Sequence, residues 1–197
     1  MATGMSAQKA ATPTAEGLAA SAKAAKIRGL PPVHLWDPPF CGDIDMRIAR
    51  DGTWFYEGSR IQRYELVRLF SSILKRERDA YFLVTPVEKV GIIVDDAPFV
   101  AVDFTVAGYG DGQDVTFETH VGDTVRADSN HPIRVALDSA SGEPAPYVIV
   151  RDGLEALIDR KSFYRLVDIG VTYGGWFGIW SGGQFFRFMD AGALEAS

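Results

Sequence analysis

The chain has 197 residues, of which 47% are hydrophobic, 23% charged and 12% aromatic, and these values exclude a chain that is disordered or fibrous throughout. Its 20 lysine and arginine residues against 26 acidic residues give a formal charge of -6, which disfavours bulk attraction to nucleic acid or to an anionic membrane. The single cysteine, Cys41, excludes an intramolecular disulfide, and the cytoplasm is the expected compartment.

Residues 1–29 are rich in alanine, serine, threonine and lysine and contain no aromatic residue. Such a segment buries too little apolar area to offset the entropy of ordering its backbone. We therefore predict a flexible tail over residues 1–29. Alanine and lysine favour a short helix over residues 19–26, but an isolated helix of that length is marginal in water.

The folded part is predicted to begin at Leu30. Two Pro-Pro pairs follow within ten residues, and they block a helix and favour an extended path along the body of the protein. Trp36 and Phe40 are the expected anchors of this path, because large aromatic side chains bury the most area per residue.

Short strands are predicted next, over residues 46–49 and 53–56. The residues between them include an Asp-Gly pair at 51 and 52, which is typical of a hairpin turn. Beyond a second turn at Glu57 and Gly58 the period of the apolar residues changes to that of a helix.

The predicted helix carries one broad apolar stripe at about 100° per residue. The stripe consists of Leu66, Val67, Leu69, Phe70, Ile73 and Leu74. We expect the basic run of Lys75, Arg76 and Arg78 to lie at the negative end of the helix dipole. The start of the helix stays open, since Ser59 and Gln62 match a capping box while Ile61 could instead close a third short strand.

Strands are predicted again over residues 81–85 and 89–94, and the turn residues near Asp96 then divide the chain. Alternating apolar residues from Phe99 indicate a half-buried strand, and similar periods recur further on. We therefore predict an N-terminal α+β domain over residues 30–96 and a C-terminal β-rich domain with one main helix over residues 97–197.

Two segments about a hundred residues apart resemble each other. The tripeptide Arg-Asp-Gly at residues 50–52 recurs at residues 151–153, and from Ile61 and Ile158 onward the segments run in register. We interpret this as a repeated hairpin-helix-hairpin motif, with chance similarity of amphipathic segments as the alternative. The predicted fold class is α+β, with mostly antiparallel strands and few helices, in two parts that each contain the motif.

Arg63 and Arg160 occupy equivalent places in the two copies and fall inside the apolar stripe of each predicted helix. An inward arginine needs a partner, and an ion pair with Asp51 or Asp152 would supply one. The alternative is that each arginine, with the amides of its helix N-terminus, binds an anionic ligand. Arg63 and Arg160 are therefore candidate ligand-binding residues.

A second candidate site lies near the start of the folded part. His34, Cys41, Asp43 and Asp45 are suitable metal ligands close together in sequence, although their spacing matches no known metal motif. In an extended segment Cys41, Asp43 and Asp45 point to one side. The alternative is a buried Cys41 beside turn and capping carboxylates.

The C-terminal segment is rich in aromatic residues, and core and sheet packing is favoured there over a ligand platform. Glycines at positions 108, 110 and 112 superficially match a phosphate loop, but they lie between predicted strands and not before a helix. We expect no cofactor. The expected partner is an unidentified small ligand or protein, with no membrane association and no nucleic acid; the sequence leaves the oligomeric state open.

Six runs of the sequence together resemble the bacterial family known as domain of unknown function 1285. They are WDPPFCGD at 36–43, RDGTW at 50–54, LVRLF at 66–70, LVTPVE at 83–88, DAPF at 96–99 and RDGLEA at 151–156. The resemblance spans almost the whole chain after residue 29. It implies a small bacterial protein of two α+β parts built from a repeated motif, with a role in signalling and no assigned catalytic residues.

The favoured function is a cytoplasmic, non-catalytic module for binding a ligand or a protein, with the groove between the halves as the default ligand site. The alternative is a small hydrolase or metal-dependent enzyme that uses the region of Cys41, Asp43 and Asp45.

Overall fold

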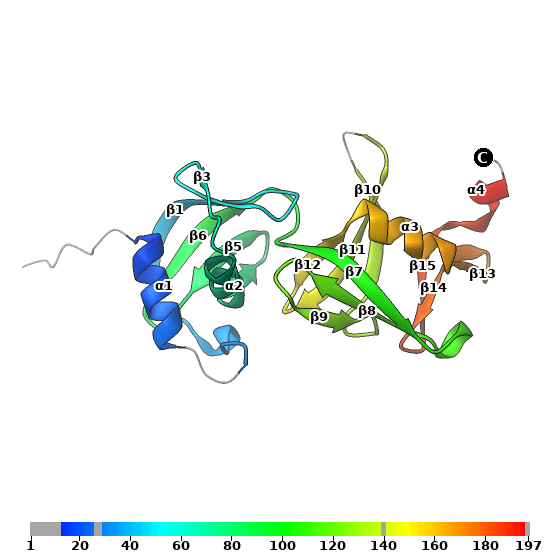
Figure 1. Ribbon diagram of the computed structural model, residues 1–197, viewed down its shortest axis with the longest axis horizontal. Coiled ribbons are helices and arrows are strands. Elements are labelled where there is room, and N and C mark those ends of the chain that lie inside the picture. Colours follow the sequence, from blue (N-terminus) through cyan, green and yellow to red (C-terminus); the bar gives the residue numbers. More distant parts are fainter. Residues whose placement is uncertain (1–12, 26–28, 139–140, 196–197) are drawn as a thin grey trace, which may run out of the picture.

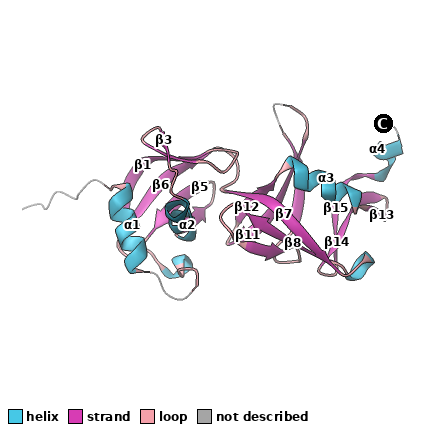
Figure 2. Ribbon diagram, in the orientation of Figure 1, coloured by secondary structure: helices cyan, strands magenta, loops and turns pink. Residues whose placement is uncertain are grey.

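The computed structural model describes residues 13–25, 29–138 and 141–195. Strands dominate this part of the chain, most of them antiparallel, with few helices (Figures 1 and 2). The predicted α+β class is confirmed, and two sheet-bearing halves lie side by side along the long axis of the molecule (Figure 1).

The N-terminal half contains one six-stranded sheet, sheet A, with the order β3-β2-β1-β6-β5-β4. Only the central pair, β1 and β6, is parallel. The elements are β1 (Phe40–Ile48), β2 (Trp54–Tyr56), β3 (Ser59–Arg60), α2 (Tyr64–Ser72), β4 (Leu74–Glu77), β5 (Ala80–Val84) and β6 (Lys89–Val94), preceded by α1 (Ala15–Ala24) and the short 3-10 helix η1 (Val33–Leu35).

The C-terminal half repeats this topology in sheet B, whose order is β10-β11-β12-β7-β8-β9, with the parallel pair β12 and β7 at its centre. Each sheet is thus two three-stranded meanders joined through one parallel pair. The elements are β7 (Phe99–Ala107), η2 (Gly110–Gly112), β8 (Asp114–Thr119), β9 (Thr124–Arg126), β10 (Ile133–Leu137), β11 (Pro144–Arg151) and β12 (Leu154–Ile158).

A third, smaller sheet, sheet C, completes the described chain with the order β13-β14-β15. Helix α3 precedes it and lies between sheets B and C (Figure 1). The elements are α3 (Arg160–Asp168), β13 (Val171–Tyr173), β14 (Trp176–Ser181), β15 (Gln184–Asp190) and α4 (Ala191–Glu195).

The predicted hairpin-helix-hairpin motif occurs in both halves, as β1-β2, α2, β4-β5 and as β11-β12, α3, β13-β14. The second hairpins differ in their place. In the first copy the second hairpin, β4-β5, joins sheet A beside β6. In the second copy sheet B is already complete, with β12 between β11 and β7, so the hairpin β13-β14 forms sheet C with β15. The same local pattern therefore serves two different tertiary positions.

Two predicted details of the first motif are wrong. Helix α2 ends at Ser72 and β4 begins at Leu74, so Lys75 and Arg76 lie on a strand rather than at a helix end. Leu74 instead pairs with Leu83 of β5, so Ile73 and Leu74 are buried where the chain passes from the helix into sheet A. The capping box is absent as well, since Ser59 belongs to β3, which fits the third-strand alternative.

The predicted tail is also wrong for residues 15–24, which form α1; residues 1–12 and 26–28 lie outside the described chain. Thr14 caps the helix by accepting a hydrogen bond from the amide of Gly17 at 3.1 Å. Leu18 is fully buried, with small alanines beside it, and α1 packs on α2. A helix that is marginal alone is stable here because α2 supplies an apolar surface.

The extended segment before β1 is only partly anchored as predicted. Trp36 packs against the core at intermediate exposure. Phe40 is 55% exposed and touches the ring of Phe82 edge-on, with centroids 6.0 Å apart. Phe40 is therefore not a buried anchor, because β1 turns its side chain to the open face of sheet A.

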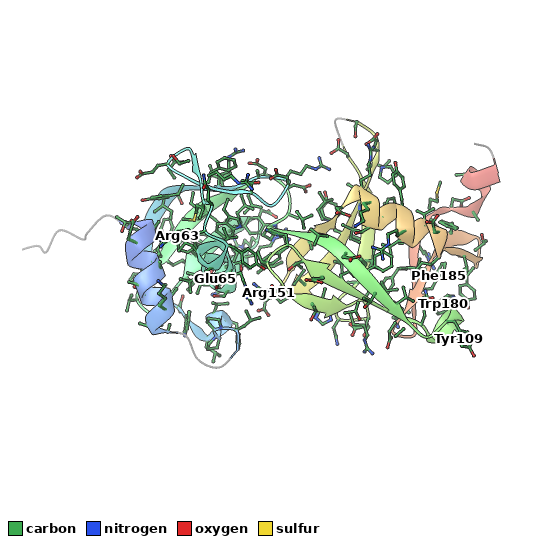
Figure 3. All side chains as sticks on the ribbon, viewed as in Figure 1. Arg63, Glu65, Tyr109, Arg151, Trp180 and Phe185 are labelled. Carbon is green, nitrogen blue, oxygen red and sulfur yellow. The ribbon has the colours of Figure 1, made fainter. Side chains whose placement is uncertain are left out.

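A single core cluster contains buried residues from both halves, including Trp54 and Phe70 from the first and Phe99 and Phe117 from the second. Arg151 crosses this junction from the last residue of β11, just before the turn to β12 (Figure 3). Its guanidinium pairs with Asp123, donates to the carbonyl of Ser71 at 2.8 Å and lies over the ring of Phe99.

Arg50, at the matching turn of the first motif, crosses in the opposite direction. It forms ion pairs with Asp138 in the C-terminal half and with Asp96 between the halves. The arginine of each Arg-Asp-Gly tripeptide therefore reaches into the other half, and the two interactions together fix how the halves sit.

His120 lies at the same junction. Its Nδ1 accepts a hydrogen bond from the amide of Val100 at 3.1 Å. The ring packs so closely on Gly52 that a Cβ atom there would approach Nε2 to 2.9 Å, and Gly52 has φ of 82°. Burial lowers the pKa of His120, so the folded protein favours the neutral ring.

Replacing Arg151 with glutamine should lower the free energy of unfolding by about 2 kcal/mol, because Asp123 and the Ser71 carbonyl lose a charged partner that is only 16% exposed. The control is Arg126→Gln, whose pairs with Asp114 and Asp128 involve a 52% exposed side chain and whose loss should cost less than about 1 kcal/mol. Urea denaturation measures both, and equal losses would contradict a special role for Arg151.

Stability should fall as the pH drops below about 6.5, the ordinary pKa of histidine. The unfolded chain binds a proton at His120 in that range, whereas the folded chain resists it until the lower folded pKa is reached. His120→Asn keeps an acceptor for the Val100 amide. In this variant the urea midpoint should change less between about pH 7.5 and about pH 5.5 than it does in the wild type. The control is His34→Asn at an exposed position, which should keep the wild-type dependence of the urea midpoint on pH. If His120→Asn keeps that dependence too, His120 is not the group that causes it.

Candidate functional site

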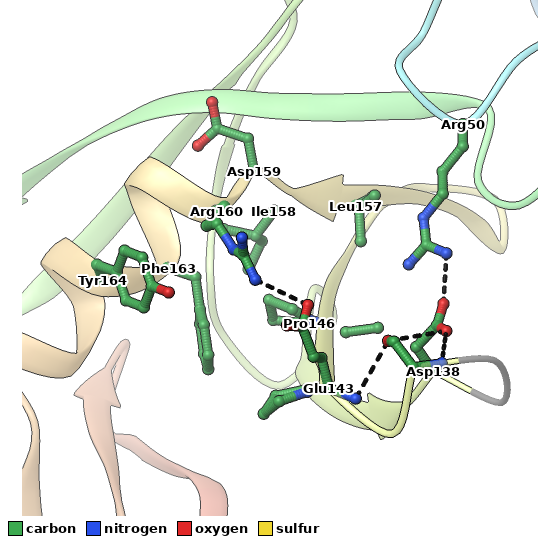
Figure 4. A pocket seen from close by; sticks show the side chains of 13 residues that line it. Arg50, Asp138, Glu143, Pro146, Leu157, Ile158, Asp159, Arg160, Phe163 and Tyr164 are labelled. Atoms are coloured by element: carbon green, nitrogen blue, oxygen red, sulfur yellow. Dashed lines mark hydrogen bonds and ion pairs between the residues drawn. The ribbon is translucent and has the colours of Figure 1, made fainter.

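The candidate site is a cleft of about 550 Å³ at the N-terminal end of α3 (Figure 4). This volume lies in the range of small-molecule sites. One wall consists of Asp138, Ser141 and Glu143 between β10 and β11, another is the first turn of α3, and Arg50 reaches in from the N-terminal half. The cleft is lined by Arg50, Asp138, Ser141, Glu143, Pro144, Ala145, Pro146, Leu157, Ile158, Asp159, Arg160, Phe163 and Tyr164.

The lining includes apolar side chains from β11, β12 and α3. Pro146 and Ile158 are buried, while Leu157 and Phe163 are half-buried. The Phe163 ring is held from behind by Phe188 of sheet C, with centroids 5.5 Å apart. Tyr164 is 58% exposed. These residues give the cleft an apolar surface that a ligand can cover.

The charged residues of the cleft form two ion pairs with different surroundings. Arg160 donates from Nη2 to Oε2 of Glu143 at 2.7 Å, and both side chains are exposed, at 67% and 61%. Arg50 pairs with the less exposed Asp138 and lies 3.2 Å from Asp96. The hydrogen bond to Asp138 raises the pKa of Arg50 above its usual value, so Arg50 stays protonated and keeps both of its carboxylate partners.

The Arg50 pair is supported from below by Tyr147 of β11. Its hydroxyl donates to Oδ1 of Asp96 at 2.8 Å. Burial, reinforced by Asp96, raises the pKa of Tyr147 to about 12. The phenol therefore stays protonated and keeps Asp96 oriented toward Arg50.

The first turn of α3 is closed by its own cap. Asp159 at the N-cap position accepts a hydrogen bond from the amide of Ser162 at 2.7 Å. The carboxylate of Asp159 is thereby committed to the helix.

Arg63 and Arg160 are exposed, which corrects the expectation that they face inward. The helical angle scale fails for them because Arg63 is the N-cap of α2 and Arg160 is the first residue of α3, so both lie at helix ends. Arg160 pairs with Glu143 and not with Asp152. Among the described residues no hydrogen bond or ion pair engages the Arg63 side chain.

The two arginines also line different concavities. Arg160 lines the cleft, whereas Arg63 lines a shallow groove beside α1 and α2 together with Lys23, Leu66 and Leu69. They therefore form no common site.

The four metal candidates are exposed, and in the described chain no three His, Cys, Asp or Glu side chains are placed to hold a metal ion. Cys41 is exposed rather than buried, and its thiol donates to the carbonyl of Pro39 at 3.4 Å. The carboxylate of Asp43 lies over the backbone of Gly91 in β6. Strand β1 does leave Cys41, Asp43 and Asp45 exposed, as the extended pattern predicts, but His34 belongs to a separate 3-10 helix.

The aromatic residues of the C-terminal segment divide between the two faces of sheet C. Ile179 and Phe186 are buried in the core. On the other face Tyr173, Trp180 and Phe185 touch one another, with centroids 4.9 to 5.3 Å apart. Tyr173 is 57% exposed, so this cluster is a second surface to consider.

Sequence reasoning missed most of the cleft. Arg50 was visible only as a turn residue, and Asp138 and Glu143 belong to a loop with no motif. A weak signal existed in the two acidic residues between β10 and β11, Asp138 and Glu143, but only the folded chain brings them to the first turn of α3.

Family models match two adjacent parts of the chain. Residues 31–97 match the N-terminal domain of the domain of unknown function DUF1285, and residues 98–188 match the C-terminal domain of the protein of unknown function DUF1285. No curated protein matches the chain. None of the helices in the described ranges has the length and apolarity needed to cross a membrane.

Two solved structures are similar to this chain. A DUF1285 family protein from Silicibacter pomeroyi DSS-3 is 68% identical, with a TM-score of 0.86 over 91% of this chain and 98% of that one. A second, from Shewanella baltica OS155, is 29% identical, with a TM-score of 0.49 over 62% of this chain and 90% of that one.

The cap of α3 should be measurable. Asp159→Ala leaves the Ser162 amide without its acceptor and should lower the free energy of unfolding by about 1 kcal/mol. The matched control is Asp168→Ala at the other end of the same helix, where loss of an acid should change stability by less than about 0.5 kcal/mol. Urea denaturation of both variants decides, and similar losses would show that Asp159 is no cap.

Proposed function

The chain belongs to the bacterial DUF1285 family, and we propose that it is a cytoplasmic, non-catalytic binding module whose ligand occupies the cleft beside α3. The observation that carries this proposal is the combination of a cleft of about 550 Å³, an apolar lining and fixed charged groups. Such a combination is typical of small-molecule sites.

The chemistry of the lining supports binding over catalysis. The residues around the cleft include arginines and carboxylates already engaged with one another, but no histidine or cysteine. The hydroxyl of Ser141 donates to Asp138 at 3.0 Å, and the same carboxylate is paired with Arg50, so the serine lies beside an ion pair rather than beside the histidine that commonly activates a nucleophilic hydroxyl.

The location of the cleft supports a regulatory role, such as signalling. Arg50 belongs to the N-terminal half, whereas Asp138 and Arg160 belong to the C-terminal half. A ligand in this cleft would touch residues of both proposed domains, 30–96 and 97–197, and would stabilise one arrangement of them.

The alternative of a hydrolase or metal enzyme around Cys41, Asp43 and Asp45 has less support. These residues lie on β1 with exposed side chains, and Cys41 is not among the residues that line the cleft. A nucleophilic cysteine needs a nearby base, and the hydrogen bond of its thiol goes to the carbonyl of Pro39.

The fluorescent probe 8-anilinonaphthalenesulfonate tests the site, because it binds exposed apolar surface. Tyr164→Ala should weaken binding of the probe by about five-fold, since Tyr164 lines the cleft. Tyr173→Ala is the matched control, because Tyr173 has nearly the same exposure, 57% against 58%, and lies in the aromatic cluster of sheet C. Weaker binding in Tyr173→Ala alone would place the ligand surface on sheet C and overturn the proposal.

A further inference from the structure

The two ion pairs of the cleft differ in how easily a ligand could replace one partner. Asp138 is held by Arg50 and also accepts hydrogen bonds from the amide and hydroxyl of Ser141. Glu143 and Arg160, by contrast, are joined by the hydrogen bond from Nη2 to Oε2 at 2.7 Å, between two largely exposed side chains. Exposed pairs of this kind contribute little to stability, so the Arg160 pair is the one that can exchange.

The geometry of the Arg160 pair leaves room for a better acceptor. Glu143 takes one N–H of the guanidinium, at Nη2. A guanidinium presents five N–H donors and binds a carboxylate most strongly through two parallel bonds. A free carboxylate that approaches with both oxygens would therefore form a stronger interaction than Glu143 does.

The position of Arg160 also sets the preferred sign of the ligand. Arg160 is the first residue of α3 and is fixed to that helix, whereas Glu143 belongs to the loop before β11. The positive end of the helix dipole adds to the charge of Arg160. The remaining acids are committed, Asp138 to Arg50 and Asp159 to the Ser162 amide.

Beside this charged end the cleft continues as an apolar surface. Leu157, Phe163 and Tyr164 line the cleft together with Arg160 (Figure 4). A ligand that reaches both regions has an anionic end and an apolar body.

We infer that the cleft takes an amphipathic carboxylate, and that Glu143 holds the position on Arg160 that the carboxylate of this ligand takes. The inference rests on the proposed function, since it names the ligand class for the same cleft. Glu143 then competes with the ligand for Arg160, so a ligand must bind Arg160 more strongly than Glu143 does.

Three probes of one shape and different charge test the ligand class: phenylpropanoate, phenylpropanamide and phenylpropylammonium. Titration followed by amide NMR signals of the cleft should give the tightest binding for phenylpropanoate, by about three-fold or more over the amide. If none of the probes shifts signals of the cleft, the proposed function fails. If the amide or the ammonium binds as well as the carboxylate, only the ligand class is overturned.

Variants of the pair test the competition. Glu143→Gln should tighten phenylpropanoate binding about two- to five-fold, because the carboxylate of the probe no longer has to displace a charged side chain from Arg160. Glu118→Gln, an exposed residue of β8 outside the cleft, makes the same change in net charge and should alter affinity by less than about two-fold.

The double variant Glu143→Gln with Arg160→Gln should bind phenylpropanoate no better than Arg160→Gln alone. An equal gain in Glu143→Gln and Glu118→Gln would reduce the effect to net charge and overturn the role of Glu143. A gain that survives loss of Arg160 would overturn it as well.

Discussion

The guanidinium of Arg151 is the interaction on which the arrangement of the two halves depends. It joins three acceptors from separate parts of the fold: the carboxylate of Asp123, the ring of Phe99 and the Ser71 carbonyl at the end of α2. The carbonyls at a helix C-terminus carry partial negative charge and lack partners within the helix. A cation with several donors satisfies one of them while keeping its own charge compensated at a site that water scarcely reaches.

Arg50 makes the reciprocal connection and also ties the junction to the cleft. It binds Asp138 at one end of the loop between β10 and β11, while Arg160 binds Glu143 at the other end. The loop is thus held at both ends by arginines from different halves. A ligand that binds beside this loop would affect the ion pair of Arg50 and Asp138, which also joins the two halves. The cleft and the junction therefore share one interaction.

The repeat in the sequence and the repeat in the fold are not the same. The sequence pattern aligns α2 with α3, whereas sheet topology aligns β1 to β6 with β7 to β12. Sheet A receives a helix between its two meanders, while the helix of the C-terminal half follows the complete sheet. The local motif is therefore reused in a position where its second hairpin must form a separate sheet.

The strand pattern, the Asp-Gly turns, the two helices and the two-part organisation follow from the sequence, because periodicity and turn chemistry act between neighbouring residues. The burial of α1, the end of α2 before Leu74 and the exposure of Arg63 and Arg160 do not follow, because each depends on packing partners or on a helix end. The cleft lies further still from the sequence. Arg50 and Asp138 are 88 residues apart in the sequence. A contact between charged side chains at such a distance leaves no periodic pattern in the sequence. The sequence by itself determined which elements form, whereas tertiary structure decided which charges meet, since only the packed sheets bring distant loops within hydrogen-bond distance.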